Sequence, residues 1–268
     1  MVTPKKPPKP EKKSLLQNLE GASKEEKLQT LYNDWHKCRR CPLVDFRCTD
    51  EGQPIEDIVF CSGNPNASIM IVGEAPGEEE MEMMVPFVGR SGKLLNQILA
   101  ATSQDAEIKQ LYAWYLKVSH TNANEKTFHS KMFEWRDREY FLTNIVACRP
   151  PENRAPLPPE MEACKTRLDN LIYTVDPLLI ISAGGIAASA LTGHKILITS
   201  RRGEIFDTPI KGKLVDVLYP TLVTLHPSYL LRKADWNVAG GDYSKTVGDY
   251  AHAQRLVKFL QEQHRGVG

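Results

Sequence analysis

The chain of 268 residues lacks a long apolar run and a targeting segment. Its longest apolar stretch, residues 177–191, is interrupted by Gly184 and Gly185 and is too short to cross a bilayer. Residues 1–13 contain five lysines, four prolines and no apolar block, so we expect no signal peptide there. We therefore expect a soluble, intracellular protein with no membrane partner.

Cysteine is scarce too, with six residues in the whole chain. Without a secretory signal the thiols are expected to stay reduced, and a chain of this length can bury a large core without crosslinks. The cysteines therefore argue against a disulfide scaffold. Ligation of a metal ion or a cluster is the chemistry to look for instead.

The chain also lacks an excess of charge of one sign, since its formal net charge is +1. This value neither indicates nor excludes a nucleic-acid partner, because a basic groove can coexist with an acidic remainder. Hydrophobic residues make up 41% and charged residues 25% of the chain, which suits one large α/β core. We expect a disordered basic tail at residues 1–13 and a single domain at residues 14–268.

Strand-like apolar runs alternate with helical patterns along the chain. This alternation predicts an α/β fold, a three-layer sandwich with a central mainly parallel sheet and helices on both faces. Residues 104–140 are rich in aromatic and charged side chains and are expected to form a helical insertion. The predicted strands are residues 69–72, 140–148 and 178–182, a hairpin of 203–206 with 214–219, and a separate strand at 221–225.

The predicted strand at residues 69–72 leads directly into the sequence Gly-Glu-Ala-Pro-Gly at residues 73–77. A carboxylate and several backbone N–H groups are therefore presented where a buried strand ends. Open α/β sheets place their ligand sites at this edge. Two further motifs accompany later predicted strands, namely Thr143-Asn144 and His226-Pro227-Ser228.

These three motifs resemble the active-site loops of the uracil-DNA glycosylase superfamily, and the Gly-Glu-Ala-Pro-Gly form resembles its family 4, the iron–sulfur branch. The resemblance covers residues 38–231. It implies a cytoplasmic enzyme of prokaryotic or phage type that acts as a monomer on uracil-containing DNA, single- or double-stranded. The implied enzyme flips the base, hydrolyses the N-glycosidic bond of deoxyuridine and leaves an abasic site for base excision repair. No lysine lies in the motifs to act as a lyase nucleophile.

Two alternatives stay open at this level. The same fold could excise another modified pyrimidine, because residues 104–140 and an insertion around Cys48 depart from the family pattern. A protein of another class, a cluster-containing DNA-binding or inhibitor protein without turnover, would keep the pocket but would not need His226. The insertion 104–140 could in addition contact a replication or repair protein through its aromatic residues.

The resemblance assigns base recognition to three residues. Phe87, in Pro-Phe-Val-Gly, is the ring expected to stack on uracil, and the amide of Asn144 offers a donor and an acceptor for the edge of the base. His226 is expected to donate a hydrogen bond to uracil O2 as charge develops on the leaving base. Without the resemblance, a core phenylalanine, a turn asparagine and a structural histidine would be the simpler interpretations.

The first motif also supplies the expected acids. Glu74 is expected to position water or to stabilise the sugar cation, and Glu80 is the second carboxylate that the family places near the pocket. Backbone groups of Gly73, Ala75 and Gly77 are expected to take part in uracil recognition. The branch with Gly-Gln-Asp-Pro-Tyr-His has its catalytic aspartate where this chain has Ala75 and a thymine-excluding tyrosine where it has Gly77, so water activation must differ in detail.

The third motif continues into residues that the resemblance implies bind DNA. Tyr229 or Leu230 is expected to fill the gap left by the flipped nucleotide. Arg232 is expected to meet a phosphate. The DNA-binding set is Ser228, Tyr229, Leu230 and Arg232.

The cysteine spacings also match the family. Cys38-x2-Cys41 and Cys148-x15-Cys164 follow its ligand layout for a [4Fe-4S] cluster. Such a cluster would order the loop between Cys148 and Cys164. Hydrolysis of a glycosidic bond requires no redox step from it.

A local group of cysteines is the alternative ligand set. Its spacing is that of a four-thiolate zinc site. Cys61 also suits a small buried hydrophobic position. The members of the local set are Cys38, Cys41, Cys48 and Cys61.

Overall fold

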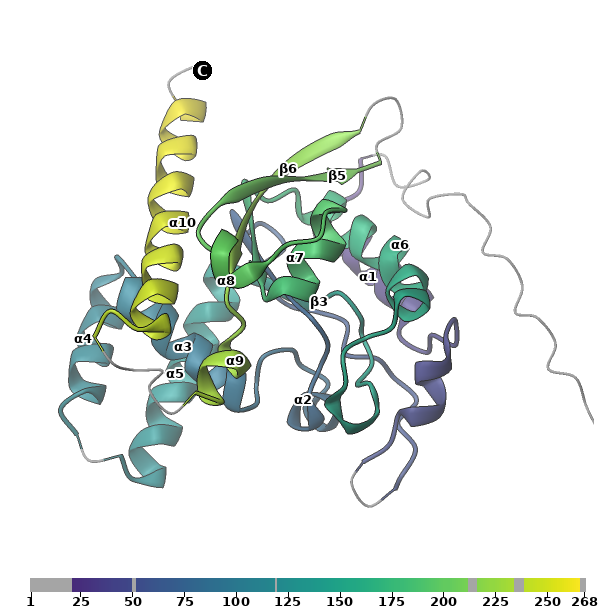
Figure 1. Ribbon diagram of the computed structural model, residues 1–268, viewed down its shortest axis with the longest axis horizontal. Coiled ribbons are helices and arrows are strands. Elements are labelled where there is room, and N and C mark those ends of the chain that lie inside the picture. Colours follow the sequence, from purple (N-terminus) through teal and green to yellow (C-terminus); the bar gives the residue numbers. More distant parts are fainter. Residues whose placement is uncertain (1–20, 50–51, 119, 212–215, 234–238, 266–268) are drawn as a thin grey trace, which may run out of the picture.

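The computed structural model describes residues 21–49, 52–118, 120–211, 216–233 and 239–265, so the predicted basic tail, residues 1–13, lies outside it. Helices cover both sides of a central sheet (Figure 1). The strands are β1 (Ser62–Gly63), β2 (Ile69–Gly73), β3 (Tyr140–Asn144), β4 (Leu179–Ala183), β5 (Ile205–Ile210) and β6 (Val217–Thr224). The helices are α1 (Lys24–Trp35), α2 (Glu78–Met83), α3 (Arg90–Thr102), α4 (Ala106–Tyr115), α5 (Asn122–Glu139), α6 (Pro158–Val175), α7 (Gly185–Thr192), α8 (Ile198–Arg201), α9 (Pro227–Leu231) and α10 (Asp242–Arg265), with the 3-10 turns η2 (Pro42–Phe46) and η3 (Pro151–Asn153).

The sheet is mainly parallel. Its strand order is β1-β3-β2-β4-β6-β5, and only the two edge strands run antiparallel to their neighbours. Every residue of β2, β3 and β4 is buried. Strands that are covered on both faces are apolar along most of their length, which makes them visible in the sequence. The predicted fold class is confirmed.

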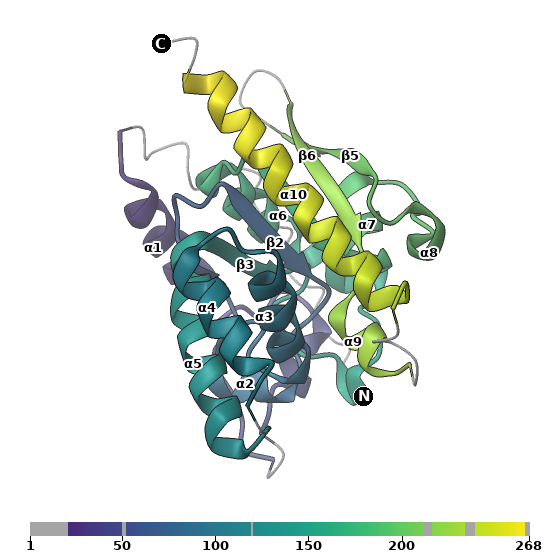
Figure 2. The ribbon, with the colours of Figure 1, turned by 90° about the vertical axis from the view of Figure 1, so that its left-hand side faces the viewer.

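Alternate residues of β2 belong to two different cores. Met70 and Val72 pack in the core that includes α1 and α6. Ile69 and Ile71 pack in the core that includes α3, α5 and α10. Figure 2 shows α10 lying across the sheet, with α3, α4 and α5 beside it. The helices on both faces therefore bury the two sides of the same strands, as the three-layer prediction requires.

The C-terminal part of the sheet differs from the prediction. The sequence predicts two strands, at residues 214–219 and 221–225, but β6 runs unbroken from Val217 to Thr224, while residues 214 and 215 lie outside the described part. Pro220 suggests a break. At Pro220, however, β6 pairs only with β5, because its ladder with β4 begins at Thr221. A missing N–H group is tolerated where no central neighbour needs it.

The segment 104–140 consists mainly of α4 and α5, which pack against each other and against α3. At its end the chain enters β3, which stops at Asn144 rather than continuing to residue 148 as predicted. The segment 104–140 is thus joined directly to β3. None of the described helices has both the length and the apolar character that a bilayer crossing needs.

Candidate active site

The carboxyl ends of β2 and β3 bring two of the predicted site residues side by side. Gly73 and Asn144 are direct partners in the parallel ladder. A Cβ atom on Gly73 would lie 2.3 Å from Oδ1 of Asn144 and 2.7 Å from Cζ of Phe87. Only glycine leaves room here for the amide and the ring to approach the strand.

The ring of Phe87 faces the imidazole of His226. Their centroids are 6.4 Å apart and their planes are inclined by 29°. Gly184, which follows β4, lies against His226, because its Cβ would be 3.1 Å from the Cβ of the histidine. Its φ of +101° is one that residues with side chains rarely adopt. Sequence reasoning did not assign Gly184 to the site; its only signal was a glycine pair after a strand.

The proton of neutral His226 is fixed by its neighbours. The backbone N–H of Ser228 donates to Nδ1 at 3.1 Å, and Oγ of Ser228 lies 2.7 Å from the same nitrogen. Nδ1 is therefore the acceptor, and the neutral ring carries its proton on Nε2. Burial lowers the pKa of His226 to about 4, with a smaller contribution from Arg232. At neutral pH this residue offers an N–H donor without a positive charge.

Arg232 extends this arrangement. Its Nη1 donates to Oγ of Ser228 at 3.2 Å, so the hydroxyl can accept from the guanidinium and donate to Nδ1 of His226. The Arg232 side chain is otherwise exposed. Arg232 therefore combines a contact that orients the imidazole with a position open to an anion.

Asn144 combines a buried position with a free side chain. It is 3% exposed, and no group in the described part of the chain hydrogen-bonds its amide. Burying an amide without partners is unfavourable. The donor and acceptor of Asn144 are thus available to a ligand that enters beside Phe87.

The backbone of Asn144 is held by Arg167 of α6. Nη2 of this fully buried guanidinium donates to the carbonyl oxygens of Asn144 and Ile145, and Nη1 donates to Oγ1 of Thr143 at 3.0 Å and to the carbonyl of Phe60 at 3.1 Å. Arg167 is not among the site residues that the sequence predicts. Its actual role is to fix the strand end that presents Asn144.

The loop that follows β2 folds around Glu80. Its Oε2 accepts the N–H of Gly77 at 2.5 Å, and the N–H groups of Phe87 and Gly89 also stabilise the carboxylate. Glu80 is 8% exposed, and this burial raises its pKa despite those donors. The N–H of Gly77, predicted to recognise the base, is thus engaged within the loop.

Glu74 is half-buried at the end of β2. Burial raises its pKa, and the positive charge of Arg232 opposes this shift. The two predicted residues, from the first and third motifs, are therefore electrostatic neighbours. Ala75 is half-buried and packs against the core on the α1 side.

The predicted DNA-binding residues of helix α9 differ in their exposure to solvent. Leu230 is 0% exposed and belongs to the core. Tyr229 is half-buried, with Nζ of Lys233 4.8 Å from its ring centroid. Of the two residues considered for filling the gap in the DNA stack, the structure leaves Tyr229 near the surface.

Four of the cysteines lie together. Cys148 and Cys164 are buried, and Cys38 and Cys41 pack against the same core. Burial raises the pKa of Cys38, of Cys41 to about 11 and of Cys148 to about 12, and Cys164 raises each of them further. The four thiols are therefore neighbours, although Cys38 and Cys41 precede β1, Cys148 follows β3 and Cys164 lies in α6.

The other two cysteines differ in their burial. Cys61 packs against the same core as Cys38 and Cys41, and burial raises its pKa to about 12 while the charge of Arg167 opposes this shift. Cys48 is exposed, with Sγ 3.8 Å from the carbonyl of Phe46. The local four-cysteine set, which needs Cys48, stays the alternative prediction.

The grouped cysteines have the ligand type that an iron–sulfur cluster uses. Among the described residues, no three His, Cys, Asp or Glu side chains have an arrangement that could hold one metal ion. A four-iron cluster needs four soft thiolates, which can come from separate segments of the chain. The set Cys38, Cys41, Cys148 and Cys164 fits that requirement in type and number.

A buried cation that sequence reasoning missed lies beside these thiols. Arg47 is 5% exposed, and its guanidinium donates to the carbonyls of Cys38 at 2.8 Å and Glu56 at 2.5 Å. Its charge acts against burial and lowers the pKa of Cys38 and Cys148. Arg47 thus favours the thiolate forms that a cluster requires.

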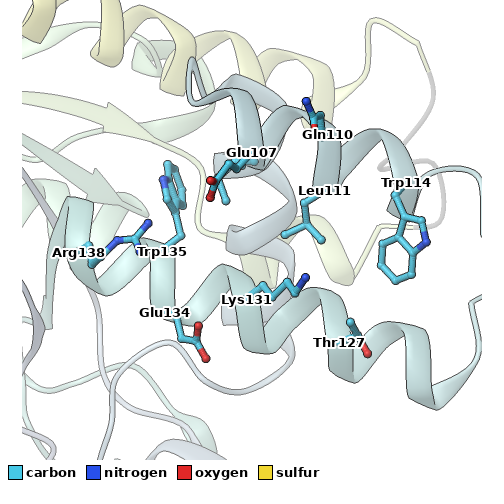
Figure 3. A pocket seen from close by; sticks show the side chains of 10 residues that line it. Glu107, Gln110, Leu111, Trp114, Thr127, Lys131, Glu134, Trp135 and Arg138 are labelled. Carbon is cyan, nitrogen blue, oxygen red and sulfur yellow. The ribbon is translucent and has the colours of Figure 1, made fainter.

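A separate cavity of about 600 Å³ lies between α4 and α5 (Figure 3). Leu111 and Trp114 of α4 face Thr127 and Lys131 of α5 across it. None of the predicted site residues lines this cavity. It lies within the segment 104–140.

Comparison with known proteins identifies the family of this chain. A family model described as the uracil DNA glycosylase superfamily matches residues 60–243. A type-4 uracil-DNA glycosylase of Thermotoga maritima is 32% identical over 211 residues, which cover 78% of this chain and 86% of the relative. Type-4 uracil-DNA glycosylases of Pyrobaculum aerophilum and Sulfurisphaera tokodaii are 31% identical over 206 residues and 32% over 210, covering 77% of this chain in both cases and 85% and 76% of the relatives. The chain belongs to the uracil DNA glycosylase superfamily, and within it to the type-4 family.

Proposed function

We propose that this protein is a monofunctional uracil-DNA glycosylase, which hydrolyses the N-glycosidic bond of deoxyuridine in DNA and leaves an abasic site. The observation that carries the proposal is the convergence of Phe87, Asn144 and His226 at one end of the parallel sheet. The type-4 relatives support the same reaction by their names and their similarity over most of the chain.

In the proposed reaction a flipped uracil stacks on Phe87 and pairs with Asn144. The amide satisfies both O4 and N3–H of the base, a pair that cytosine does not offer. His226 donates Nε2–H to O2, where negative charge develops as the bond breaks. A preorganised donor of this kind contributes roughly 10²- to 10³-fold to the rate.

Glu74 is the proposed acid on the sugar side. Its carboxylate, kept near Arg232, would stabilise the cationic sugar or position the attacking water. Glu80 is assigned a supporting role, because its oxygens already receive backbone N–H groups of the loop. The backbone of Gly73 and Ala75 would contribute the remaining polar contacts to the base.

We propose that DNA lies along the loops at this edge of the sheet. Arg232 would meet a phosphate, Ser228 would keep His226 oriented, and Tyr229 would fill the place of the flipped nucleotide, while Leu230 anchors the helix in the core. We expect a monomer that acts in the cytoplasm. Contact of a replication or repair protein with residues 104–140 stays a prediction.

We further propose that Cys38, Cys41, Cys148 and Cys164 bind a [4Fe-4S] cluster. Bound there, the group would supply a structural crosslink between the N-terminal segment and the loop after β3, with no step in the hydrolysis. Support comes from the effect of Cys164 on the pKa values of Cys38, Cys41 and Cys148, and from Arg47 beside them.

The test uses oligonucleotides that carry one uracil, in single- and double-stranded form, followed by alkaline cleavage of abasic sites. Strand breaks are expected with uracil and not with thymine. Oligonucleotides with other modified pyrimidines measure the range of bases. The variant Asn144→Ala/His226→Ala serves as the control for contaminating activity. A wild-type protein that binds DNA but produces no breaks with any base would be a binding protein, and the proposal would be wrong.

A further inference from the structure

Phe87 has a backbone conformation that is unusual for an aromatic residue. Its φ of 58° lies in the left-handed region, which bulky side chains rarely adopt. The ring is 3% exposed and faces His226. A conformation of this kind persists only where its surroundings enforce it.

The carbonyl end of Phe87 is held by Arg136 of α5. Nη1 of Arg136 donates to the Phe87 oxygen at 2.8 Å and lies 3.4 Å from Oδ1 of Asn96. Nε and Nη2 each donate to Oδ1 of Asp137 at 3.3 Å. The guanidinium is 0% exposed. Gly92 also approaches so closely that a Cβ there would lie 1.8 Å from the same oxygen.

The N–H group of Phe87 acts on the carboxylate of Glu80, because it lowers the pKa of that group against the effect of burial. The carboxylate accepts the N–H of Gly77 at 2.5 Å and is almost completely buried. Glu80 is close enough to Arg136 to favour its charged form against the effect of burial. The buried side chains of Glu80 and Arg136, which carry opposite charges, therefore lie on either side of the Phe87 backbone. Glu80 is near its N–H group, and Arg136 binds its carbonyl oxygen.

We propose that Arg136 is a positioning residue for the base-stacking ring. Together with Glu80 it locks the left-handed backbone of Phe87 and so sets the ring against the imidazole of His226. The inference rests on the proposed function, and it gives the insertion 104–140 a part in the active site that none of the sequence motifs indicates. If Arg136 only filled space in the core, its replacement would change the stability of the fold, and any loss of activity would not depend on the Phe87 ring.

The experiment is a double-mutant cycle on uracil release from a single-stranded oligonucleotide, with unfolding midpoints measured in parallel. The variants are Arg136→Met, Phe87→Ala and their combination, with Arg138→Met as the control, an exposed arginine on the same helix. Arg136→Met is expected to lower kcat/KM about 10- to 100-fold, since small misplacement of a binding group can cost on the order of 100-fold. In the Phe87→Ala background the same change is expected to have almost no further effect, because the ring it positions is gone.

Arg136→Lys covers the case in which the methionine variant does not fold. A single ammonium can retain the charge but cannot contact Phe87, Asn96 and Asp137 together, so an intermediate loss is expected, again absent without the ring. Equal losses with and without the Phe87 ring, or full activity in the folded variants, would overturn the inference. An inactive wild type would contradict the proposed function instead, so the two failures are distinguishable.

Discussion

The backbone N–H of Ser228 lies 3.1 Å from Nδ1 of His226 and leaves the proton of the neutral imidazole on Nε2. The helix cap that starts α9 therefore also prepares a hydrogen-bond donor at the end of β6. No binding of DNA is needed to select this tautomer. The catalytic contribution of His226 can be tested apart from its effect on folding.

Loss of the imidazole should slow the chemical step. His226→Ala is expected to lower kcat roughly 10²- to 10³-fold, the usual cost of removing one donor to a developing anion. KM should change much less, because Phe87 and Asn144 still bind the base. Single-turnover release of uracil measures the chemical step, and a fluorescence anisotropy titration checks that DNA binding is retained. An unchanged single-turnover rate would exclude the proposed contact with O2.

The low pKa of His226 makes a specific contribution to the pH dependence of stability. In the native protein its pKa is about 4 because the ring is buried, whereas a histidine in an unfolded chain has a value of about 6.5. Below about pH 6.5 the unfolded chain takes up a proton that the native protein refuses, so the free energy of unfolding should fall as the pH drops from about 6.5 to about 4.

Urea unfolding of wild type and His226→Gln over this pH range measures the contribution. The difference in the free energy of unfolding between the two proteins should be constant above about pH 6.5. Below that pH the wild type should lose stability relative to His226→Gln. His194→Gln, at an exposed position, controls for the loss of one histidine. A difference that does not vary across the range would show that the ring titrates normally.

Gly73→Ala should damage the site more than the fold. The added Cβ would meet Oδ1 of Asn144 at 2.3 Å and Cζ of Phe87 at 2.7 Å, so the amide and the ring must both move. We expect kcat/KM for uracil release to fall by about 100-fold, because both groups that hold the base are displaced. Gly248→Ala in α10, where a Cβ meets no atom within 4 Å, should keep full activity. Full activity in Gly73→Ala would contradict this packing.

The cysteine ligands can be separated by their effect on a bound cluster. Visible absorbance of the purified protein should be lost in Cys148→Ala and kept in Cys48→Ala and Cys61→Ala. Removal of the cluster by oxidation and chelation should lower the unfolding midpoint of wild type and leave that of Cys148→Ala unchanged. Metal analysis that finds zinc in place of iron, lost in Cys48→Ala, would favour the local ligand set.

The resemblance of the motifs singled out Phe87, Asn144 and His226, and the parallel strands explain why Asn144 and His226 reach the same edge of the sheet. The three buried arginines were not predictable in the same way. Arg167 reaches the carbonyl of Phe60 and Arg136 that of Phe87, contacts between segments far apart in the sequence. In a sequence an arginine suggests a solvated surface, and only the meeting of such segments reveals which carbonyl groups need its donors.

The pairing of Gly73 with Asn144 has a consequence for how selectivity arises. Side chains alternate between the two faces of a strand, so a shift of β3 by one residue against β2 would turn the Asn144 amide to the opposite layer and replace it by a neighbour. The amide that would distinguish uracil from cytosine is thus set by the backbone ladder of the sheet when the chain folds. Ordering of a loop on contact with DNA is not required to create it.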